Sequence, residues 1–133
     1  MSFIADLSEM DAATVLAVGW LHPDHPYARG ESSPEFLKRL KVFARLWGKS
    51  VQALGWGVAM GYHTCEFCGQ AWGSGTFGVP DGGRLFFVPE LIPHYVEAHG
   101  YAPLAEFVAA VLASPLPGTP EYGTAVRGFA EGH

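Results

Sequence analysis

Two cysteines and two histidines, in two short segments, constrain the fold of this chain more than any other feature of the sequence. Cys65 and Cys68 are its only cysteines, and His94 and His99 are two of its six histidines. Two thiols two residues apart, followed by two imidazoles about one helical turn apart, form the ligand set of a tetrahedral zinc site. We therefore expect these four residues to bind zinc, with metal–ligand bonds replacing part of a hydrophobic core.

The two histidines are five residues apart, whereas side chains that lie next to each other on a helix are three or four residues apart. Five residues along an ideal helix advance the chain by about 140° beyond a full turn, so His94 and His99 do not quite share a face. Binding one metal therefore requires the last turn to loosen or tighten, which Gly100 directly after His99 makes easy. The alternative is two core or surface histidines beside a free dithiol.

Three further residues near these ligands could complete or support the site. His63 precedes Cys65 by two residues and points the same way in an extended chain, so it could replace a helix histidine or hydrogen-bond to a ligand. A structural role is the favoured alternative for His63. Glu97 and Glu66 could each orient a metal-bound imidazole, and for Glu66 ordinary solvent exposure is the favoured interpretation.

A separate polar cluster lies in a loop upstream of these residues. His22, Asp24 and His25 alternate with Pro23 and Pro26, and the prolines exclude a helix and stiffen the loop. The cluster could form a second metal or binding site, although an ordinary polar loop is the favoured interpretation.

The sequence predicts an α+β fold, with a small antiparallel sheet or hairpin and two to three helices organised around the zinc-finger-like site. Ser33 and Pro34 predict a helix over 34–47, because serine caps a helix and proline fits its first position; Gly48 ends the apolar pattern. A helix over 90–99 would carry both histidines. A further short helix is predicted from the apolar stripe of Leu104, Phe107, Val108, Val111 and Leu112.

Strand signals lie on both sides of the cysteines. Residues 14–21 are apolar and partly β-branched, which indicates a buried strand, and residues 58–60 are a plausible short strand before the cysteines. Residues 77–79 and 84–88 predict a β-hairpin, because the Asp-Gly pair at 81–82 supplies the positive φ angles of a tight turn.

Length and composition are those of one folded domain. A chain of 133 residues that is 49% apolar and 16% charged can bury a core but is too short for two domains. We predict a single domain over 1–133, with its core at about 12–113 and a surface arm or flexible tail at 114–133. Three residues could dock this tail: Tyr122, Val126 and Phe129.

The expected compartment favours metal binding over a disulfide. No apolar run reaches the roughly 18 residues needed to span a bilayer, and the N-terminus lacks the pattern of a secretory signal. We therefore expect a cytoplasmic protein without a membrane span. Its cysteines would be reduced, so zinc binding is favoured over a structural disulfide.

The charges argue against general nucleic-acid binding, and we expect a protein partner instead. The net charge is −5, whereas nucleic-acid binders usually carry a basic surplus. Half of the Lys and Arg residues lie along the outer side of the predicted 34–47 helix: Lys38, Arg39, Lys41 and Arg45. We interpret this side as a solvated face whose long side chains cover apolar flanks, in preference to a phosphate or acidic-partner contact.

The sequence patterns of several zinc and thiol enzymes are absent. The deaminase pattern of His-x-Glu before Pro-Cys-x-x-Cys and the His-Glu-x-x-His of zinc proteases do not occur. A His-Asn-His nuclease needs an Asp-His or His-His pair entering its hairpin, where this chain has Arg84-Leu85-Phe86-Phe87. A thioredoxin-like role needs the cysteines at the start of a helix, and glycines follow Cys68 instead.

Several segments together resemble a family of small, uncharacterised bacterial proteins. In chain order they are Gly19-Trp20-Leu21, His25-Pro26-Tyr27, Ser33-Pro34-Glu35-Phe36, His63-x-Cys65-Glu66-Phe67-Cys68, and the segment from Pro89 to Tyr101. The Cys-Glu-Phe-Cys and His-Tyr-Val-Glu-Ala-His strings are the specific parts. The resemblance runs from about Gly19 to Phe107, leaves the tail outside, and implies no established activity.

Two functions are compatible with these patterns. The first is a non-enzymatic interaction or regulatory module with a structural zinc and a protein partner. The second is a zinc-dependent hydrolase or nuclease that uses His63 or the loop from His22 to His25. A closed shell of four ligands favours the first function, and a metal-bound water in a cleft favours the second.

Overall fold

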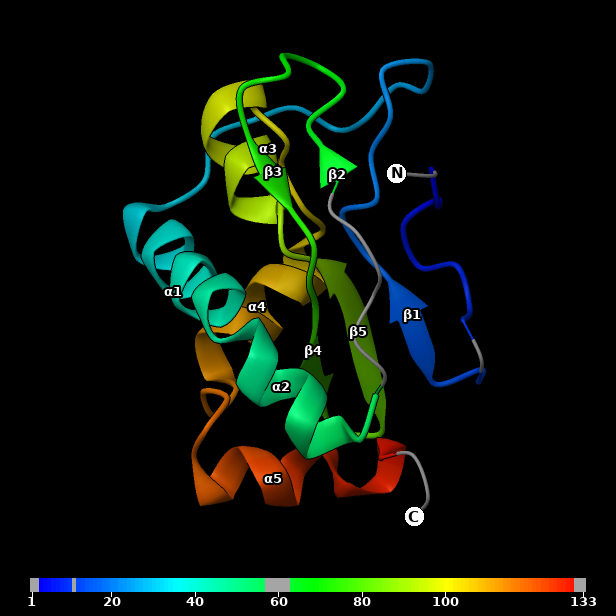
Figure 1. Cartoon of the computed structure of the whole chain (residues 1–133), viewed down its shortest axis with the longest axis vertical. Helices are drawn as coiled ribbons and strands as arrows, with labels where there is room; N and C mark the ends of the chain where they lie inside the picture. The colour runs from blue at the N-terminus through cyan, green and yellow to red at the C-terminus, as the bar shows by residue number, and fades with distance from the viewer. Residues whose placement is uncertain (1–2, 11, 57–62, 131–133) are drawn as a thin grey trace.

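The computed structural model describes residues 3–10, 12–56 and 63–130, which form an α+β fold (Figure 1). The helices and strands, in chain order, are β1 (Val15–Ala17), α1 (Pro34–Arg45), α2 (Trp47–Leu54), β2 (His63–Thr64), β3 (Trp72–Gly73), β4 (Thr76–Asp81), β5 (Arg84–Pro89), α3 (Ile92–His99), α4 (Ala105–Ala113), α5 (Pro120–Val126) and the 3₁₀ helix η1 (Arg127–Phe129). The fold class is as predicted, with more helices than the two to three expected. The strand expected at 58–60 lies outside the described residues.

The central sheet has the strand order β1-β5-β4 and is mixed, not purely antiparallel. The predicted hairpin is present as β4 and β5, which pair from Thr76↔Pro89 to Asp81↔Arg84. β1 pairs with β5 in parallel, with Leu16 opposite Phe86. A parallel pair needs a long crossover connection, and the chain between β1 and β5 provides it through α1, α2 and the β2–β3 hairpin.

The strand predicted over 14–21 is shorter than expected. It ends at Ala17 because Gly19 adopts a left-handed φ of 85° and donates its N–H to the Asp6 carboxylate at 3.0 Å. The N-terminal segment then pairs along the outer side of this strand, through isolated bridges that join Glu9 to Leu16 and Ile4 to Trp20. Backbone pairing therefore continues past β1, although the regular strand does not.

The helix predicted over 34–47 ends earlier and is followed directly by a second helix. The Ser33 hydroxyl accepts the Phe36 N–H at 3.1 Å, as expected of an N-cap. α1 ends at Arg45, and Gly48, the expected end, lies exposed inside α2. α2 forms because Val51 and Leu54 are buried against the hairpin, and this burial outweighs the low helix propensity of glycine.

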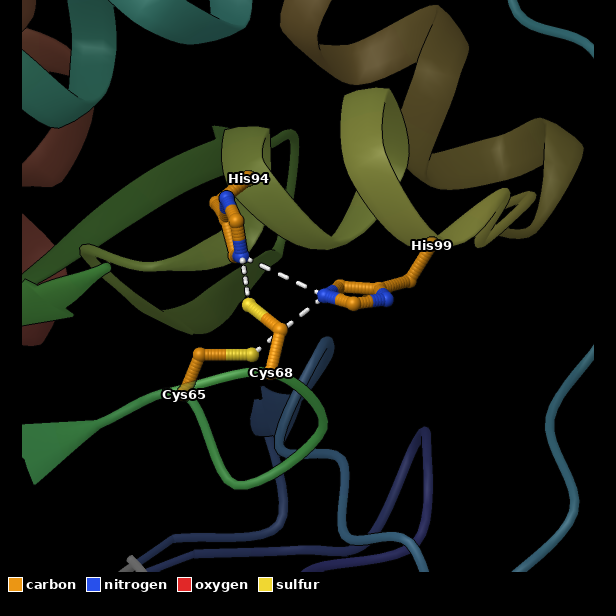
Figure 2. A group of neighbouring side chains, drawn as sticks. All are labelled: Cys65, Cys68, His94 and His99. Carbon is orange, nitrogen blue, oxygen red and sulfur yellow. Dashed lines mark hydrogen bonds between the residues drawn. The ribbon is translucent and has the colours of Figure 1, made fainter. Parts of the chain in front are cut away.

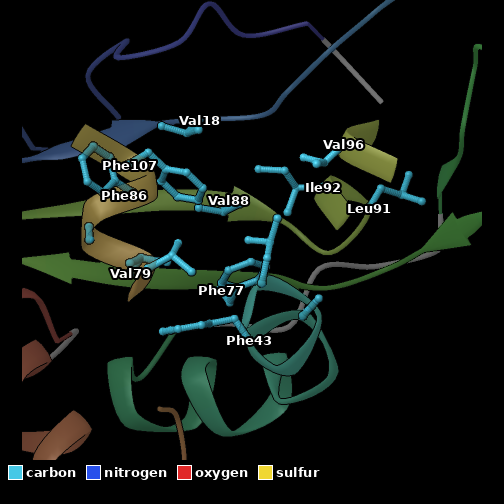
Figure 3. Packing of buried hydrophobic residues seen from close by; sticks show 14 of the residues in the cluster. Val18, Phe43, Phe77, Val79, Phe86, Val88, Leu91, Ile92, Val96 and Phe107 are labelled. Carbon is cyan, nitrogen blue, oxygen red and sulfur yellow. The ribbon is translucent and has the colours of Figure 1, made fainter. Parts of the chain in front are cut away.

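The core lies between the sheet and the helices that cover it (Figure 3). Phe43 of α1 stacks on Phe77 of β4 with ring centroids 5.8 Å apart, and Phe86 of β5 meets Phe107 of α4 edge-on at 5.5 Å. In α4 the buried residues are Phe107, Ala110 and Val111, whereas two of the predicted stripe residues, Leu104 and Leu112, are exposed. Cys65 also belongs to the buried cluster, so one predicted metal ligand borders the core.

The segment expected to be a surface arm or flexible tail folds back onto the body through residue 130. Tyr122 and Val126 are fully buried in the main core, and α5 lies at the end of the molecule opposite α3 (Figure 1). All three residues named as possible docking residues contact the core, Tyr122 and Val126 as buried side chains and Phe129 as a partly buried one. No helix in the described ranges is long and apolar enough to cross a membrane.

Candidate metal centre

A tight turn between β2 and β3 presents the two cysteines. The strands pair His63 with Gly73 and Thr64 with Trp72, and the Cys65 N–H donates to the Ala71 carbonyl at 2.7 Å, closing the base of the turn. The Gly69 N–H donates to the Cys65 carbonyl at 2.7 Å, with Gly69 at a left-handed φ of 67°. Glycine adopts this conformation without strain, so the sequence Cys-Glu-Phe-Cys-Gly turns both thiols toward α3.

The two histidines lie at opposite ends of α3. His94 is in the first turn, just after Pro93, which the helix tolerates because its first N–H groups need no helical partner. His99 is the last residue, and Gly100 follows with a left-handed φ of 66°. The helix therefore begins at Ile92 instead of residue 90 and ends at His99, as predicted.

The four candidate ligand atoms converge on one point (Figure 2). All four lie within 4.8 Å of one another. The His94 and His99 Nε2 atoms are 3.3 Å apart, the Cys68 Sγ is 3.3 Å from the His94 Nε2, and the Cys65 Sγ is 3.5 Å from the His99 Nε2. Tetrahedral zinc with ordinary bond lengths separates two nitrogens by about 3.3 Å and a sulfur from a nitrogen by about 3.6 Å. The side chains thus fit such an ion.

Backbone N–H groups support the two sulfur atoms. The Gln70 N–H donates to the Cys68 Sγ at 3.4 Å, and the backbone N–H groups of Phe67 and Cys68 act to lower the pKa of the Cys65 thiol. Hydrogen bonds of this kind stabilise thiolates and fix their direction. The turn therefore offers both sulfurs in a prearranged position.

Electrostatics keep both the buried thiol and the second imidazole neutral when no cation is near. Burial raises the pKa of the Cys65 thiol, the N–H groups of Phe67 and Cys68 oppose the rise, and the Cys68 thiol adds to it. Burial also lowers the pKa of His99, and the nearby His94 and Arg29 lower it further. A neutral imidazole is the form that binds metal, and a divalent cation would favour the thiolates.

The cluster lies at the boundary between core and solvent. Cys65 is buried and Cys68 is exposed, while the two histidines are half-buried. The Phe67 ring closes one side, with its centroid 5.9 Å from the Tyr95 ring and 5.1 Å from the His99 ring. A metal here would be shielded on its inner side and reachable from outside.

The residues expected to support the ligands have other partners. His63 lines a small cavity together with Trp20 and Glu90, and among the described residues it does not join the four-residue group. Glu97 forms an ion pair with Lys41 at 3.0 Å. Glu66 is not simply solvated, because its carboxylate lies 3.2 Å from the His22 Nε2.

The loop cluster of His22, Asp24 and His25 does not form a second metal group in the described part of the chain. The Asp24 N–H donates to the His22 Nδ1 at 3.1 Å, so the Nε2 carries the proton that faces Glu66. His25 stacks on Phe3 with ring centroids 3.8 Å apart. The loop is thus tied to the cysteine turn by the His22–Glu66 contact.

Tyr27 contributes to the site and was not singled out as a site residue from the sequence. Its hydroxyl donates to the His99 carbonyl at 2.8 Å, and its ring meets Phe67 edge-on. The only available signal was its place in the His-Pro-Tyr segment. A backbone contact of this kind cannot be inferred from spacing, because Tyr27 and His99 are far apart in the chain.

Comparison with known proteins gives a family and no function. The model of the family DUF7919, described as a domain of unknown function, matches residues 2–112. The chain belongs to this family. The DUF7919 match begins earlier than the expected span of 19–107 and likewise leaves the tail outside. No curated protein matches the chain, and no solved structure matches it.

Proposed function

We propose that this DUF7919 chain is a zinc-stabilised interaction module, in which Cys65, Cys68, His94 and His99 hold one structural zinc ion. The observation that carries the proposal is the convergence of two sulfur and two nitrogen atoms at separations of 3.3 to 3.5 Å. Four such ligands form a closed set that leaves no position for substrate, which is the mark of a structural site. Thiolate and imidazole ligands together suit zinc better than magnesium or calcium.

The position of the site supports a structural role. A zinc ion there would join the β2–β3 hairpin to α3, two elements that are separated in sequence by the β4–β5 hairpin. Zinc would supply cross-linking and would stabilise the folded state by its binding free energy. It would also hold the cysteine turn against the core through the buried Cys65.

An exposed aromatic residue on the same hairpin supports an interaction role. Trp72, on β3, is 68% exposed. Tryptophan is enriched among the residues that dominate binding energy in protein interfaces, and an indole ring that is two-thirds exposed contributes little apolar burial to the fold. We therefore propose that the module binds a protein partner and does not catalyse a reaction.

The hydrolase or nuclease hypothesis receives no support from the positions of its key residues. His63 lies beside Glu90 in a separate cavity with a volume of about 40 Å³, which is room for little more than one water molecule. His22 is engaged with Glu66. Neither imidazole is placed at an open position on the candidate metal.

Elemental analysis and cobalt substitution test the zinc proposal. Protein purified without chelators should contain about one zinc per chain, and Co²⁺-loaded protein should show the absorption bands of a tetrahedral site with two thiolates. Cys68→Ser should lose the metal, whereas His63→Ala, the matched control, should keep it. Metal-free wild-type protein, or equal loss from both variants, would overturn the proposal.

A further inference from the structure

The positive charge of this acidic chain is concentrated in one segment. Residues 36–65 contain five of the eight Lys and Arg residues and none of the thirteen Asp and Glu residues. This segment therefore carries a net charge of +5, and the rest of the chain carries −10. Such separation of charge within one small domain creates a local field that attracts acidic groups.

Two of the five basic residues have partners in the structure. Arg39 donates to the carbonyl groups of Val111 and Ser114 at the end of α4, so its role is to cap that helix. Lys41 is held by Glu97 of α3 at 3.0 Å, although its side chain remains 48% exposed. Lys38, Arg45 and Lys49 are exposed on the outer side of α1 and α2.

The exposed cations lie in adjacent rows that run through both helices. Lys41, Arg45 and Lys49 follow one another at four-residue spacing, and so do Lys38, Val42 and Leu46; residues at this spacing are neighbours on a helix surface. The rows continue across the junction because the Leu46 N–H donates to the Val42 carbonyl at 3.0 Å and the Ser50 N–H donates to the Leu46 carbonyl at 3.1 Å. We call these six residues the α1–α2 face.

The centre of the α1–α2 face is apolar. Val42 and Leu46 are half-exposed, and they are not among the partly buried apolar residues that pack against the described core. Three cations thus flank two apolar side chains along one side, and Lys38 lies at one end of the apolar row, on one surface about 16 Å long, at 1.5 Å per residue. A phosphate group would contact only the cations of this face. An acidic peptide with apolar side chains would contact both the cations and the two apolar residues.

We propose that the α1–α2 face binds an acidic, amphipathic segment of a partner protein. Charge complementarity sets the orientation and the rate of encounter, and burial of Val42 and Leu46 contributes apolar contact. Nucleic acid is disfavoured because the rest of the chain, at −10, would repel a polyanion that extends beyond the face. The proposal names the kind of partner that the zinc-stabilised module takes and so rests on its proposed interaction role.

A selection from a display library of random sixteen-residue peptides tests this proposal without assuming a sequence. The enriched peptides should be net acidic and should carry apolar residues three or four positions apart. Their affinity should fall at least about fivefold when NaCl is raised from about 50 mM to about 500 mM, since exposed charges are screened. Enriched peptides without an acidic bias would overturn the proposal.

Variants locate the binding surface. The double variant Lys38→Glu/Arg45→Glu should weaken the selected peptides at least about tenfold, and Val42→Ser/Leu46→Ser should weaken them about threefold or more. Arg127→Glu, an exposed charge reversal on η1, should change affinity less than about twofold. Equal affinities for the Lys38/Arg45 and Arg127 variants, at unchanged thermal midpoints, would overturn the proposal.

Two further measurements separate this proposal from its competitors. A labelled random twenty-nucleotide DNA that binds the α1–α2 face more tightly than the selected peptides would replace the acidic partner with nucleic acid. Zinc content is measured on the same samples. If wild-type protein holds one zinc per chain but binds no peptide, the docking surface is refuted and the zinc proposal is not. If zinc-free wild-type protein binds the peptides, the zinc proposal is refuted and the docking surface is not.

Discussion

The backbone around His99 is held by a residue from a distant loop. Tyr27 donates its hydroxyl to the His99 carbonyl, and the Arg29 guanidinium lies 4.6 Å from the centre of the Tyr27 ring. His99 is the last residue of α3, where carbonyl groups lack helical partners. Tyr27 satisfies one of them and so fixes the end of the helix from which His99 reaches the other candidate ligands.

Replacement of this hydroxyl should weaken metal binding without abolishing it. Tyr27→Phe keeps the ring against Phe67 but removes the hydrogen bond to His99. Groups that orient a ligand change metal affinity by about tenfold to a hundredfold, and we expect the lower end because Tyr27 acts through the backbone. Competition with a chromophoric chelator measures the change. An affinity equal to that of the wild type, or an equal loss in the remote variant Tyr122→Phe, would contradict the role of Tyr27.

The β2–β3 hairpin has little to stabilise it apart from the candidate metal. β2 and β3 are each two residues long, and a hairpin of this size is not stable alone in water. α3, in contrast, buries Ile92, Tyr95 and Val96 in the core to which β4, β5 and α1 also contribute. Dependence on metal should therefore be confined to one end of the molecule.

Removal of the metal should loosen this end before the rest unfolds. We expect chelation, or Cys68→Ser, to increase amide hydrogen exchange strongly in 63–73 and less in 92–99, where α3 keeps its buried side chains, while α1 and the β4–β5 hairpin stay protected. Hydrogen exchange followed by mass spectrometry measures each segment, with His63→Ala as control. Uniform loss of protection over all segments would show that the metal supports the whole core, and unchanged protection would show that it supports nothing.

The elements that could be predicted are those with local signals. The cysteine turn, the β4–β5 hairpin and the end of α3 each depend on a glycine or a short motif within a few residues. α2 and the parallel pairing of β1 with β5 depend on burial against distant segments, which spacing along the chain does not encode. The grouping of the four candidate ligand residues was predictable for the same reason: they lie in two local motifs, whereas Tyr27 reaches the candidate site only through the tertiary fold.

The tail lies at the end of the molecule opposite the candidate metal centre (Figure 1). The Thr119 hydroxyl accepts the Tyr122 N–H at 3.2 Å, so Thr119 caps α5. Thr119-Pro120-Glu121 repeats the helix-start pattern of Ser33-Pro34-Glu35. The Pro- and Gly-rich composition of the tail nevertheless favoured the prediction of an arm without a helix. α5 lies beyond the part of the chain that matches the family, yet it shares the core of that part.

Tyr122 ties the tail to both the hairpin and α2. Its hydroxyl donates to the Gly78 carbonyl at 2.6 Å and so must accept the Ser50 hydroxyl proton, also at 2.6 Å; Ser50 in turn accepts the Gly78 N–H at 2.9 Å. Burial raises the pKa of Tyr122 to about 12, although both hydrogen bonds oppose the rise. The phenol therefore stays neutral, and its hydroxyl group acts as both donor and acceptor.

Removal of the Tyr122 hydroxyl should destabilise the whole domain, not only its tail. Tyr122→Phe leaves the Gly78 carbonyl and the Ser50 hydroxyl buried without their partner, which costs about 1–3 kcal/mol. Ser50→Ala breaks the same network, so the double variant should lose less than the sum of the two single variants. Urea unfolding followed by tryptophan fluorescence and by far-UV circular dichroism measures these losses. Coincident transitions that shift together would show that α5 belongs to the cooperative core, whereas an early, separate loss of helix signal would show that the tail folds on its own.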